Sequence, residues 1–265
     1  MISSRSNPTI RRLRRLQRER GDSAVLEGPA LIAEAAAAGV ALESVLATPE
    51  FLAGAEARRL QGLLSRPPQT LSPTLLSELT DADSPRGVLA LAHLPRPGIE
   101  GLPVGDGIYV YLDGIQQPAN LGALARVAEA AGARGLVLAP GSVHPNHPRA
   151  LRASAGSLLR LPVAVGAAPA AVARRLAPRR PRWVALEPRG GVDLWQAELP
   201  RNIVLALGAE GPGLSDACSS LADLRLRVAM ETPVESLNVT VAAALVLFEL
   251  RRRAAASRRP AAGRP

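Results

Sequence analysis

Short apolar runs alternate with helical segments from residue 108 onward, and this alternation restricts the fold more than any other feature of the sequence. The apolar runs are IYVYLDGI, GLVLAP, LPVAV, RWVALEP, NIVLALG and LRLRVAM. Each has the length of a strand and is apolar on both faces, as strands covered on both sides are. Helical patterns, including PRALRASAGSLLR as one helix, separate the first four runs. The sequence therefore predicts an α/β fold with a mostly parallel sheet between layers of helices.

A smaller α/β pattern precedes this region. The strands AVLE, SVLATP and RGVLALAHL alternate with the helices ALIAEAAAA, AEARRLQGLL and SPTLLSELT, the last capped by Ser72. The stretch PRPGIEGLPVGDG carries proline and glycine too densely for a helix or a strand. We therefore expect a small domain at 1–94, a linker at 95–107, a larger domain at 108–252 and a basic, disordered tail at 253–265.

The positive charge of the chain comes from arginine alone. Its 32 basic residues include no lysine, and with 23 acidic residues the formal net charge is +9. Codon bias explains part of this arginine content, but the net excess still favours a polyanionic partner, with nucleic acid ahead of a membrane surface. The single cysteine, Cys218, allows no internal disulfide, and neither a membrane span nor a signal peptide is evident. We expect a cytoplasmic protein.

An arginine-rich helix is predicted near the N-terminus, within SNPTIRRLRRLQRERG. Asn7 is its candidate N-cap, Pro8 takes the first helical position, and Ile10, Leu13 and Leu16 share one side. The other faces carry Arg11, Arg12, Arg14, Arg15 and Arg18. From the pattern alone these arginines form either a solvated surface or a phosphate-binding one.

Polar or glycine-rich motifs follow three of the predicted strands. In LDGIQQPANLGALARVAEAAG, Asn120 is a predicted helix N-cap, and Arg126 lies about two turns further on at a different angle. In IVLALGAEGPGLS, Glu210 stands among glycines that lack the dinucleotide fingerprint and the lysine of a phosphate loop. In ESLNVTVAAALVLFEL, Ser236 is the predicted cap, which leaves Asn238 unexplained. Each could be an ordinary cap or loop residue, but strand ends of this kind of sheet face ligands.

Taken together, the three motifs resemble those of the SpoU family of RNA ribose 2′-O-methyltransferases, also called the TrmH family. N-x-G-x-x-x-R contains Asn120 and Arg126, G-x-E-G-x-G-L-S contains Glu210, and S-L-N-V-T-V-A contains Ser236 and Asn238. SNPTI and LEGPALIAEA are similar to the small RNA-binding domain, of L30e-like fold, in the rRNA-directed members, and LRASAGSLLRLPV is similar to another family segment. The resemblance covers nearly the whole chain except the tail.

The resemblance changes the expected topology. General rules predict an open sheet, because true knots are essentially absent from proteins. The SpoU family instead implies a C-terminal trefoil knot, in which the last segment threads a loop and builds the cofactor pocket. It also implies a homodimer with the site near the subunit interface, S-adenosylmethionine as cofactor, and no metal.

Roles for individual residues follow from the resemblance. Asn120 would position the active-site loop and Arg126, Glu210 would organise the crevice near the sulfonium, and Ser236 and Asn238 would orient the ribose or the arginine. A guanidinium stays protonated in proteins, so we expect Arg126 to stabilise the developing alkoxide and bind phosphate rather than to act as the base. The implied cofactor contacts are Leu207, Gly208, Gly213, Val228, Met230 and Leu237. The implied RNA contacts are Arg5, Asn7, Arg11, Arg12 and Arg15.

The implied activity is S-adenosylmethionine-dependent 2′-O-methylation of RNA, with 23S rRNA favoured by the small N-terminal domain. Methylation of tRNA and a noncatalytic RNA-binding role on the same fold are the alternatives within the family. A nicotinamide-dependent oxidoreductase is a further alternative, against which the missing dinucleotide fingerprint argues. The sequence does not identify the target nucleotide.

Overall fold

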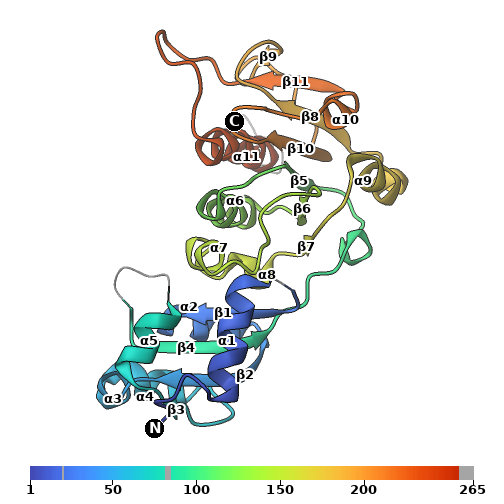
Figure 1. The fold of residues 1–265 in the computed structure, drawn as a ribbon. Coiled ribbons are helices and arrows are strands. Elements are labelled where there is room, and N and C mark those ends of the chain that lie inside the picture. The colour runs from blue at the N-terminus through green and yellow to red at the C-terminus, as the bar shows by residue number, and fades with distance from the viewer. Residues whose placement is uncertain (20, 81–84, 257–265) are drawn as a thin grey trace, which may run out of the picture. The chain divides into compact units, whose positions relative to one another are not determined.

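A computed structural model of the 265-residue chain describes residues 1–19, 21–80 and 85–256. The described residues form two compact units, shown as a ribbon in Figure 1. The N-terminal unit consists of Met1–Arg96 together with His144–Arg160, and the larger unit consists of Pro97–Val143 together with the described residues from 161 onward. The chain therefore passes between the units three times.

A four-stranded sheet in the order β1-β4-β2-β3 forms the centre of the N-terminal unit. Its strands are β1 (Ser23–Glu27), β2 (Ala41–Ala47), β3 (Gln69–Thr70) and β4 (Val88–His93). β4 pairs antiparallel with β1 and with β2, whereas β3 pairs parallel with β2. The helices of this unit are α1 (Pro8–Arg18), α2 (Pro29–Ala37), α3 (Pro49–Ala53), α4 (Ala55–Gln61), α5 (Pro73–Leu79), α7 (Pro148–Ala153) and α8 (Ser157–Arg160).

Helix α1 confirms the features expected of the N-terminal helix. The Asn7 side-chain oxygen accepts a hydrogen bond of 2.9 Å from the Thr9 amide, and Pro8 occupies the first turn. Ile10 and Leu13 are fully buried, so their shared side faces the core. Ser72 caps α5 by accepting a hydrogen bond from the Leu75 amide. Local capping chemistry thus determined these two helix starts.

The segment His144–Arg160 belongs to the N-terminal unit by its contacts, although the sequence pattern assigned it to the larger domain. The Asn146 amide donates to the carbonyls of Gly21 at 2.7 Å and Leu94 at 2.8 Å, and its oxygen accepts from Arg96 Nε at 2.8 Å. Further along, Arg152 forms an ion pair with the nearly buried Glu27. Long-range polar contacts of this kind leave no signal in a local pattern.

Seven parallel strands form the sheet of the larger unit, in the order β7-β6-β5-β10-β8-β11-β9. They are β5 (Ile108–Asp113), β6 (Gly135–Leu138), β7 (Val163–Ala164), β8 (Arg182–Leu186), β9 (Val192–Asp193), β10 (Ile203–Gly208) and β11 (Leu224–Arg227). Because successive residues of the central strands point to opposite faces and are buried on both, the sheet has a helical layer on each side. The predicted parallel α/β sheet is confirmed.

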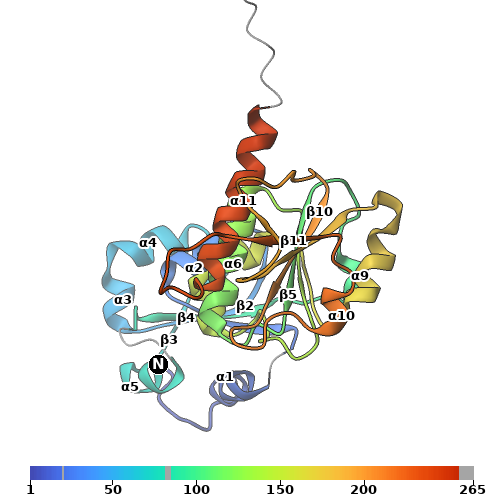
Figure 2. The same ribbon diagram turned by 90° about the horizontal axis from the view of Figure 1, so that it is seen from above.

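Two pairs of helices cover this sheet (Figure 2). α6 (Pro118–Ala131) and α11 (Val239–Ala256) pack against each other on one face. α9 (Pro169–Leu176) and α10 (Asp216–Ser219) pack on the other face, in a core that contains Tyr109 and Tyr111. Two short 3-10 helices, η1 (Ile99–Gly101) and η2 (Ala177–Arg179), complete the unit. Within the described residues, no helix combines the length and the apolar character needed to cross a membrane.

Three segments differ from the sequence-based expectations. The expected single helix PRALRASAGSLLR is divided into α7 and α8, because Ala155 and Gly156 adopt left-handed backbone angles, with φ of 47° and 89°. The expected linker at 95–107 contains η1 and packs into the core, where Leu102 is buried and the Pro103 carbonyl accepts from the Tyr109 hydroxyl at 2.8 Å. α11 continues to Ala256 through four residues expected in the tail. The rest of the tail lies outside the described residues.

Candidate functional site

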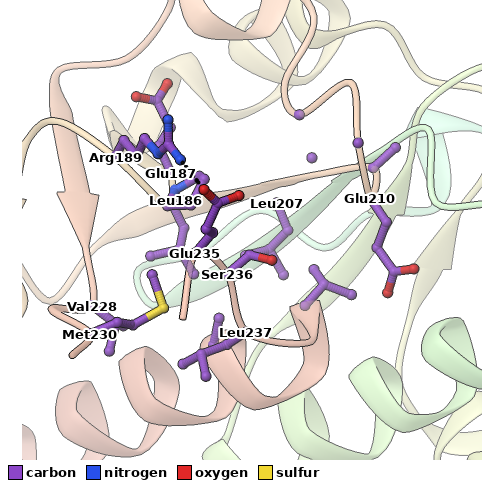
Figure 3. A pocket seen from close by; sticks show the side chains of 17 residues that line it. Leu186, Glu187, Arg189, Leu207, Glu210, Val228, Met230, Glu235, Ser236 and Leu237 are labelled. Atoms are coloured by element: carbon purple, nitrogen blue, oxygen red, sulfur yellow. Dashed lines mark hydrogen bonds and ion pairs between the residues drawn. The ribbon is translucent and has the colours of Figure 1, made fainter. Parts of the chain in front are cut away.

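A cavity of about 350 Å³ opens at the carboxyl ends of β8 and β10 (Figure 3). Three segments border it: residues 186–189 after β8, residues 207–213 at the end of β10, and residues between 228 and 242 that lead into α11. Ligands of parallel α/β sheets bind at this edge, and the volume lies in the range of about 300–1,000 Å³ usual for small-molecule sites.

A glycine-rich turn after β10 forms one wall of the cavity. Ala209 and Gly213 exchange two backbone hydrogen bonds, of 3.1 and 3.0 Å, that close the turn. A Cβ on Gly208 would lie 2.2 Å from the Gly213 carbonyl carbon, so only glycine fits where the strand meets the turn. Beyond the turn, the Ser215 amide donates to the Asp113 carboxylate at 2.7 Å, which fastens the turn to β5.

All six residues implied as cofactor contacts line this cavity: Leu207, Gly208, Gly213, Val228, Met230 and Leu237. Two of the residues implied as catalytic, Glu210 and Ser236, line it as well. The end of β8 also lines the cavity, through four residues that no motif predicted: Leu186, Glu187, Pro188 and Arg189. The rule that ligands lie at strand ends could have pointed to these four residues, because RWVALEP was a predicted strand.

Three polar side chains from the three motifs meet beside the cavity. Asn120 Nδ2 donates to Glu210 Oε1 at 2.7 Å. Asn238 Nδ2 lies 3.2 Å from Asn120 Oδ1 and 3.5 Å from Glu210 Oε1. One carboxylate oxygen therefore orients both amides, while Glu210 Oε2 makes no hydrogen bond with the described residues. We call Asn120, Glu210 and Asn238 the polar triad.

Both helix caps predicted near the site were wrong. Asn120 lies inside the first turn of α6, whose N-cap is Gln117, so its side chain is available to Glu210. Ser236 does not cap α11. The helix begins at Val239, and Asn238 Oδ1 accepts from the Thr240 amide at 2.9 Å. Asn238 thus uses its oxygen to cap α11 and its nitrogen in the polar triad. These two roles explain why an asparagine stands at this position, which the sequence pattern did not.

Arg126 stands apart from the polar triad. Six residues along a helix correspond to about 9 Å of rise and about 240° of rotation, so Arg126 and Asn120 leave α6 in different directions. Arg126 is exposed, and its side chain makes no hydrogen bond or ion pair with any residue that the structure describes. The three motifs therefore bring together only part of the catalytic set implied by the resemblance.

Carboxylates dominate the charge around the cavity. Glu187 is paired with Arg225, and Glu235 is paired with Arg189 at 3.1 Å across the cavity mouth (Figure 3). Glu210 has no arginine partner within the described part of the chain. The pair at the mouth is largely exposed on both sides, so it contributes little to stability. The excess of carboxylates favours a cationic ligand.

Cys218, on α10, is not a nucleophile of this site. Burial, with a smaller contribution from the Asp113 carboxylate, raises the pKa of its thiol to about 12. The thiol is therefore neutral at physiological pH.

Most of the arginines implied as RNA contacts have acidic neighbours. Arg5 pairs with Glu78, Arg12 lies 2.7 Å from Glu43, and Arg15 lies 4.0 Å from Glu19. All three side chains remain between 44% and 68% exposed, so phosphates can still reach them. Arg11 is exposed and makes no side-chain bond with the described residues. The oxygen of Asn7, by contrast, is used by the helix cap.

Comparison with known families identifies the chain. The SpoU rRNA Methylase family matches residues 107–248, which is more than half of the chain. The chain belongs to the SpoU rRNA methylase family. The N-terminal region of thiostrepton-resistance methylases matches residues 1–100. The resemblance inferred from the three motifs is therefore confirmed.

Named relatives of the SpoU family match most of the chain. A 23S rRNA (uridine(2479)-2′-O)-methyltransferase of Streptomyces viridochromogenes is 32% identical over 186 residues, which cover 68% of this chain and 65% of that protein. A 23S rRNA (guanosine(2553)-2′-O)-methyltransferase of Bacillus subtilis is 30% identical over 181 residues, 68% of this chain and 71% of that protein.

A solved structure of the same family shares the whole fold. The SpoU methyltransferase AviRb of Streptomyces viridochromogenes, in complex with the cofactor AdoMet, superposes with a TM-score of 0.87 at 26% identity. The match covers 97% of this chain and 100% of that one. The predicted methyltransferase fold is confirmed, and the trefoil knot stays a prediction.

Proposed function

We propose that this protein transfers a methyl group from S-adenosylmethionine to the 2′-hydroxyl of a ribose in 23S rRNA. The observation that carries the proposal is the polar triad beside a cavity lined by every implied cofactor contact. The two relatives named above act on 23S rRNA according to their names, one on a uridine and one on a guanosine.

The residues of the cavity fit S-adenosylmethionine. Leu207, Val228, Met230 and Leu237 supply apolar walls, and the tight turn at Gly208 exposes backbone groups to a ligand. The surrounding carboxylates suit a positively charged sulfonium. When bound, this cofactor supplies a methyl group that is activated by its positive sulfur.

The polar triad holds the acceptor in line for transfer. Asn238 Nδ2 uses its two hydrogens on Asn120 Oδ1 and Glu210 Oε1, so the second amide hydrogen of Asn120 and the Glu210 Oε2 atom remain available to a ribose. Ser236, exposed at the cavity, adds a hydroxyl that helps orient the same sugar. Holding the reacting groups in fixed positions accounts for much of the barrier reduction in such transfers.

Arg126 would bind an RNA phosphate and stabilise charge that develops on the ribose oxygen. Its guanidinium remains protonated, so it acts as a cation and not as the base. Its exposure and lack of a partner within the described residues leave it available for this task.

The N-terminal unit would hold the RNA substrate. Arg5, Arg11, Arg12 and Arg15 present exposed guanidinium groups on or beside α1, whereas Asn7 serves mainly as the cap of that helix. We assign the substrate-binding role to residues 1–94 together with the segment 144–160 that packs with them. A bacterial-type rRNA substrate implies a cytoplasmic location.

We also propose a homodimer and a C-terminal trefoil knot. Val241 and Phe248 on α11, and the nearby Trp195, are 51%, 47% and 57% exposed, which supports an apolar contact surface on this helix. The knot is supported by β10, which lies between β5 and β8, and by the segment before α11, which shares one cavity with the turn after β10.

Transfer of a labelled methyl group from S-adenosylmethionine to total rRNA and total tRNA tests the proposal. We expect incorporation into 23S rRNA, and loss of at least a hundredfold in Arg126→Ala. Arg174→Ala, which removes another exposed helical arginine of the same unit, is the matched control and should retain activity. Absence of both methyl transfer and cofactor binding in the wild type would refute the enzyme assignment.

A further inference from the structure

The amino ends of the sheet strands in the larger unit carry a concentration of arginines. Arg182 begins β8, Arg134 immediately precedes β6, and Arg201 lies two residues before β10. Because all seven strands are parallel, these strand starts share the edge opposite to the cofactor cavity. We define the arginine edge as Arg134, Arg179, Arg180, Arg182, Arg201 and Arg251.

Hydrogen bonds around Asn202 bring these arginines together. The Asn202 side chain accepts from the Gly107 amide at 3.2 Å and donates to the Arg179 carbonyl at 2.6 Å. Its backbone carbonyl accepts from the Arg182 amide at 3.0 Å. The Arg134 amide donates to the Ile108 carbonyl in the neighbouring strand at 2.7 Å. These contacts place four loops side by side at one edge.

An open hollow of about 850 Å³ adjoins this edge. Arg201, Asn202, Arg251 and Arg253 line it, with Asp106 as the acidic residue among its lining. Arg251 reaches back to the Ala130 carbonyl, which ties the last turns of α11 to α6. The hollow therefore combines three arginines with apolar lining residues such as Ile108 and Leu199.

Two of these guanidinium groups make no contact that holds the fold together. Arg179 and Arg180 are exposed, and their side chains make no hydrogen bond or ion pair with the described residues. The nearby carboxylates are Asp106, Glu198 and Asp223, and the last already accepts from the Trp183 amide at 2.8 Å. The cationic charge of this edge is thus only partly neutralised.

Charge is segregated between the two edges of the sheet. The cavity edge carries Asp113, Glu187, Glu210 and Glu235. Arg225 and Arg189 pair with Glu187 and Glu235, and the other two carboxylates repel phosphate groups. The arginine edge attracts them. A polyanion that presents one ribose to the cavity would gain most of its electrostatic attraction within this unit at the opposite edge.

We propose that the arginine edge binds backbone phosphates of the RNA whose target ribose occupies the cavity. This inference rests on the proposed function. The strand β5 has six residues and separates the two edges by about 20 Å, at about 3.3 Å per residue. Measured along the axis of a nucleic-acid helix, one strand carries a phosphate about every 3.4 Å, so at most roughly six nucleotides span that distance. A short stretch of RNA can therefore reach both edges at once.

Binding of fluorescently labelled 23S rRNA to the full chain, measured by anisotropy across a salt titration, tests this surface. The variant is Arg179→Gln/Arg180→Gln, and the control Arg174→Gln/Arg227→Gln removes the same charge from exposed arginines that are not among the six of the arginine edge. Each lost phosphate contact lowers the salt slope by about 0.9 and weakens binding about fivefold at 0.15 M salt. We expect about 30-fold weaker binding for the edge variant and less than threefold for the control.

The results separate this inference from the proposed function. Equal RNA affinity in the edge variant and the wild type, or equal losses in variant and control, would overturn the arginine edge as an RNA contact. Neither result depends on methyl transfer, which is measured separately. Arg201→Gln alone, which leaves the positive φ of Arg180 untouched, provides a second variant and should weaken binding about fivefold.

Discussion

Replacing Gly208 by alanine should weaken binding of S-adenosylmethionine by roughly tenfold to 30-fold. The new Cβ would lie 2.2 Å from the Gly213 carbonyl carbon and 2.4 Å from the Leu214 nitrogen, so the turn must move by more than about 1 Å. That movement breaks the two backbone hydrogen bonds between Ala209 and Gly213. At about 1 kcal/mol each, their loss amounts to about 2 kcal/mol, or about a factor of 30 in affinity.

Isothermal titration calorimetry with S-adenosylmethionine measures this effect, and two other glycines calibrate it. A Cβ on Gly211 meets no atom within 4 Å, but its φ of 92° costs about 1–2 kcal/mol, so Gly211→Ala should lose about fivefold to 30-fold through backbone strain alone. Gly62 has φ of −66° and a nearest atom at 3.6 Å, so Gly62→Ala should bind normally. Wild-type affinity in Gly208→Ala would refute the assignment of this turn as the wall of the cofactor site.

Three further predictions concern other groups. Asn238→Asp keeps an oxygen for the Thr240 amide but sets a carboxylate against Glu210, so kcat/KM for methyl transfer should fall about tenfold to a hundredfold, with the melting temperature unchanged. Hydrogen bonds from two arginines of α11 lower the pKa of Glu249 to about 2, below its ordinary 4.5. Stability should therefore fall as the pH drops from about 4.5 towards 2, and chemical denaturation of Glu249→Gln should show a weaker dependence over that interval. The buried thiol of Cys218 should react with a maleimide at pH 8 far more slowly in the native protein than in urea, and equal rates would contradict its raised pKa.

The sheet and the cavity were predictable from sequence because their signals are local. Apolar runs of strand length marked nearly every strand of the larger unit, and parallel topology assigns ligands to the strand ends. The six implied cofactor contacts lie at those ends or just beyond them, which is why they all line one cavity. The two-residue strands β3 and β9 lie outside any apolar run, so no local pattern marked them.

The predicted N-cap residues were wrong where more than one nearby residue has the chemistry of a cap. Ser236 and Asn238 are both good cap residues, and only the position at which α11 begins decides between them. Asn120 also has cap chemistry, but Pro118 starts α6 two residues earlier. The direction of each side chain therefore depended on a helix start that composition does not fix.

Long-range packing was also beyond the sequence pattern. The helical run PRALRASAGSLLR contains Ala155 in a left-handed conformation, which alanine rarely adopts and which no propensity predicts. The attachment of 144–160 to the N-terminal unit depends on Asn146, whose partners are more than fifty residues away in sequence. Local periodicity contains no information about such contacts.

Two separate stretches of chain, Met1–Arg96 and His144–Arg160, build the N-terminal unit. This division limits how RNA specificity can be exchanged between members of the family. A chimera joined once, after Arg96, would bring a foreign sheet against the resident 144–160, whose Asn146 must donate to the carbonyls of Gly21 and Leu94. The carbonyl groups that accept from Asn146 are present whatever side chain stands at those positions. The ion pair of Arg152, by contrast, requires an acidic residue at the position of Glu27. A successful exchange therefore needs three junctions, because residues 144–160 must be replaced together with residues 1–96. The segment that accompanies a new RNA specificity thus lies in the middle of the sequence of the catalytic domain.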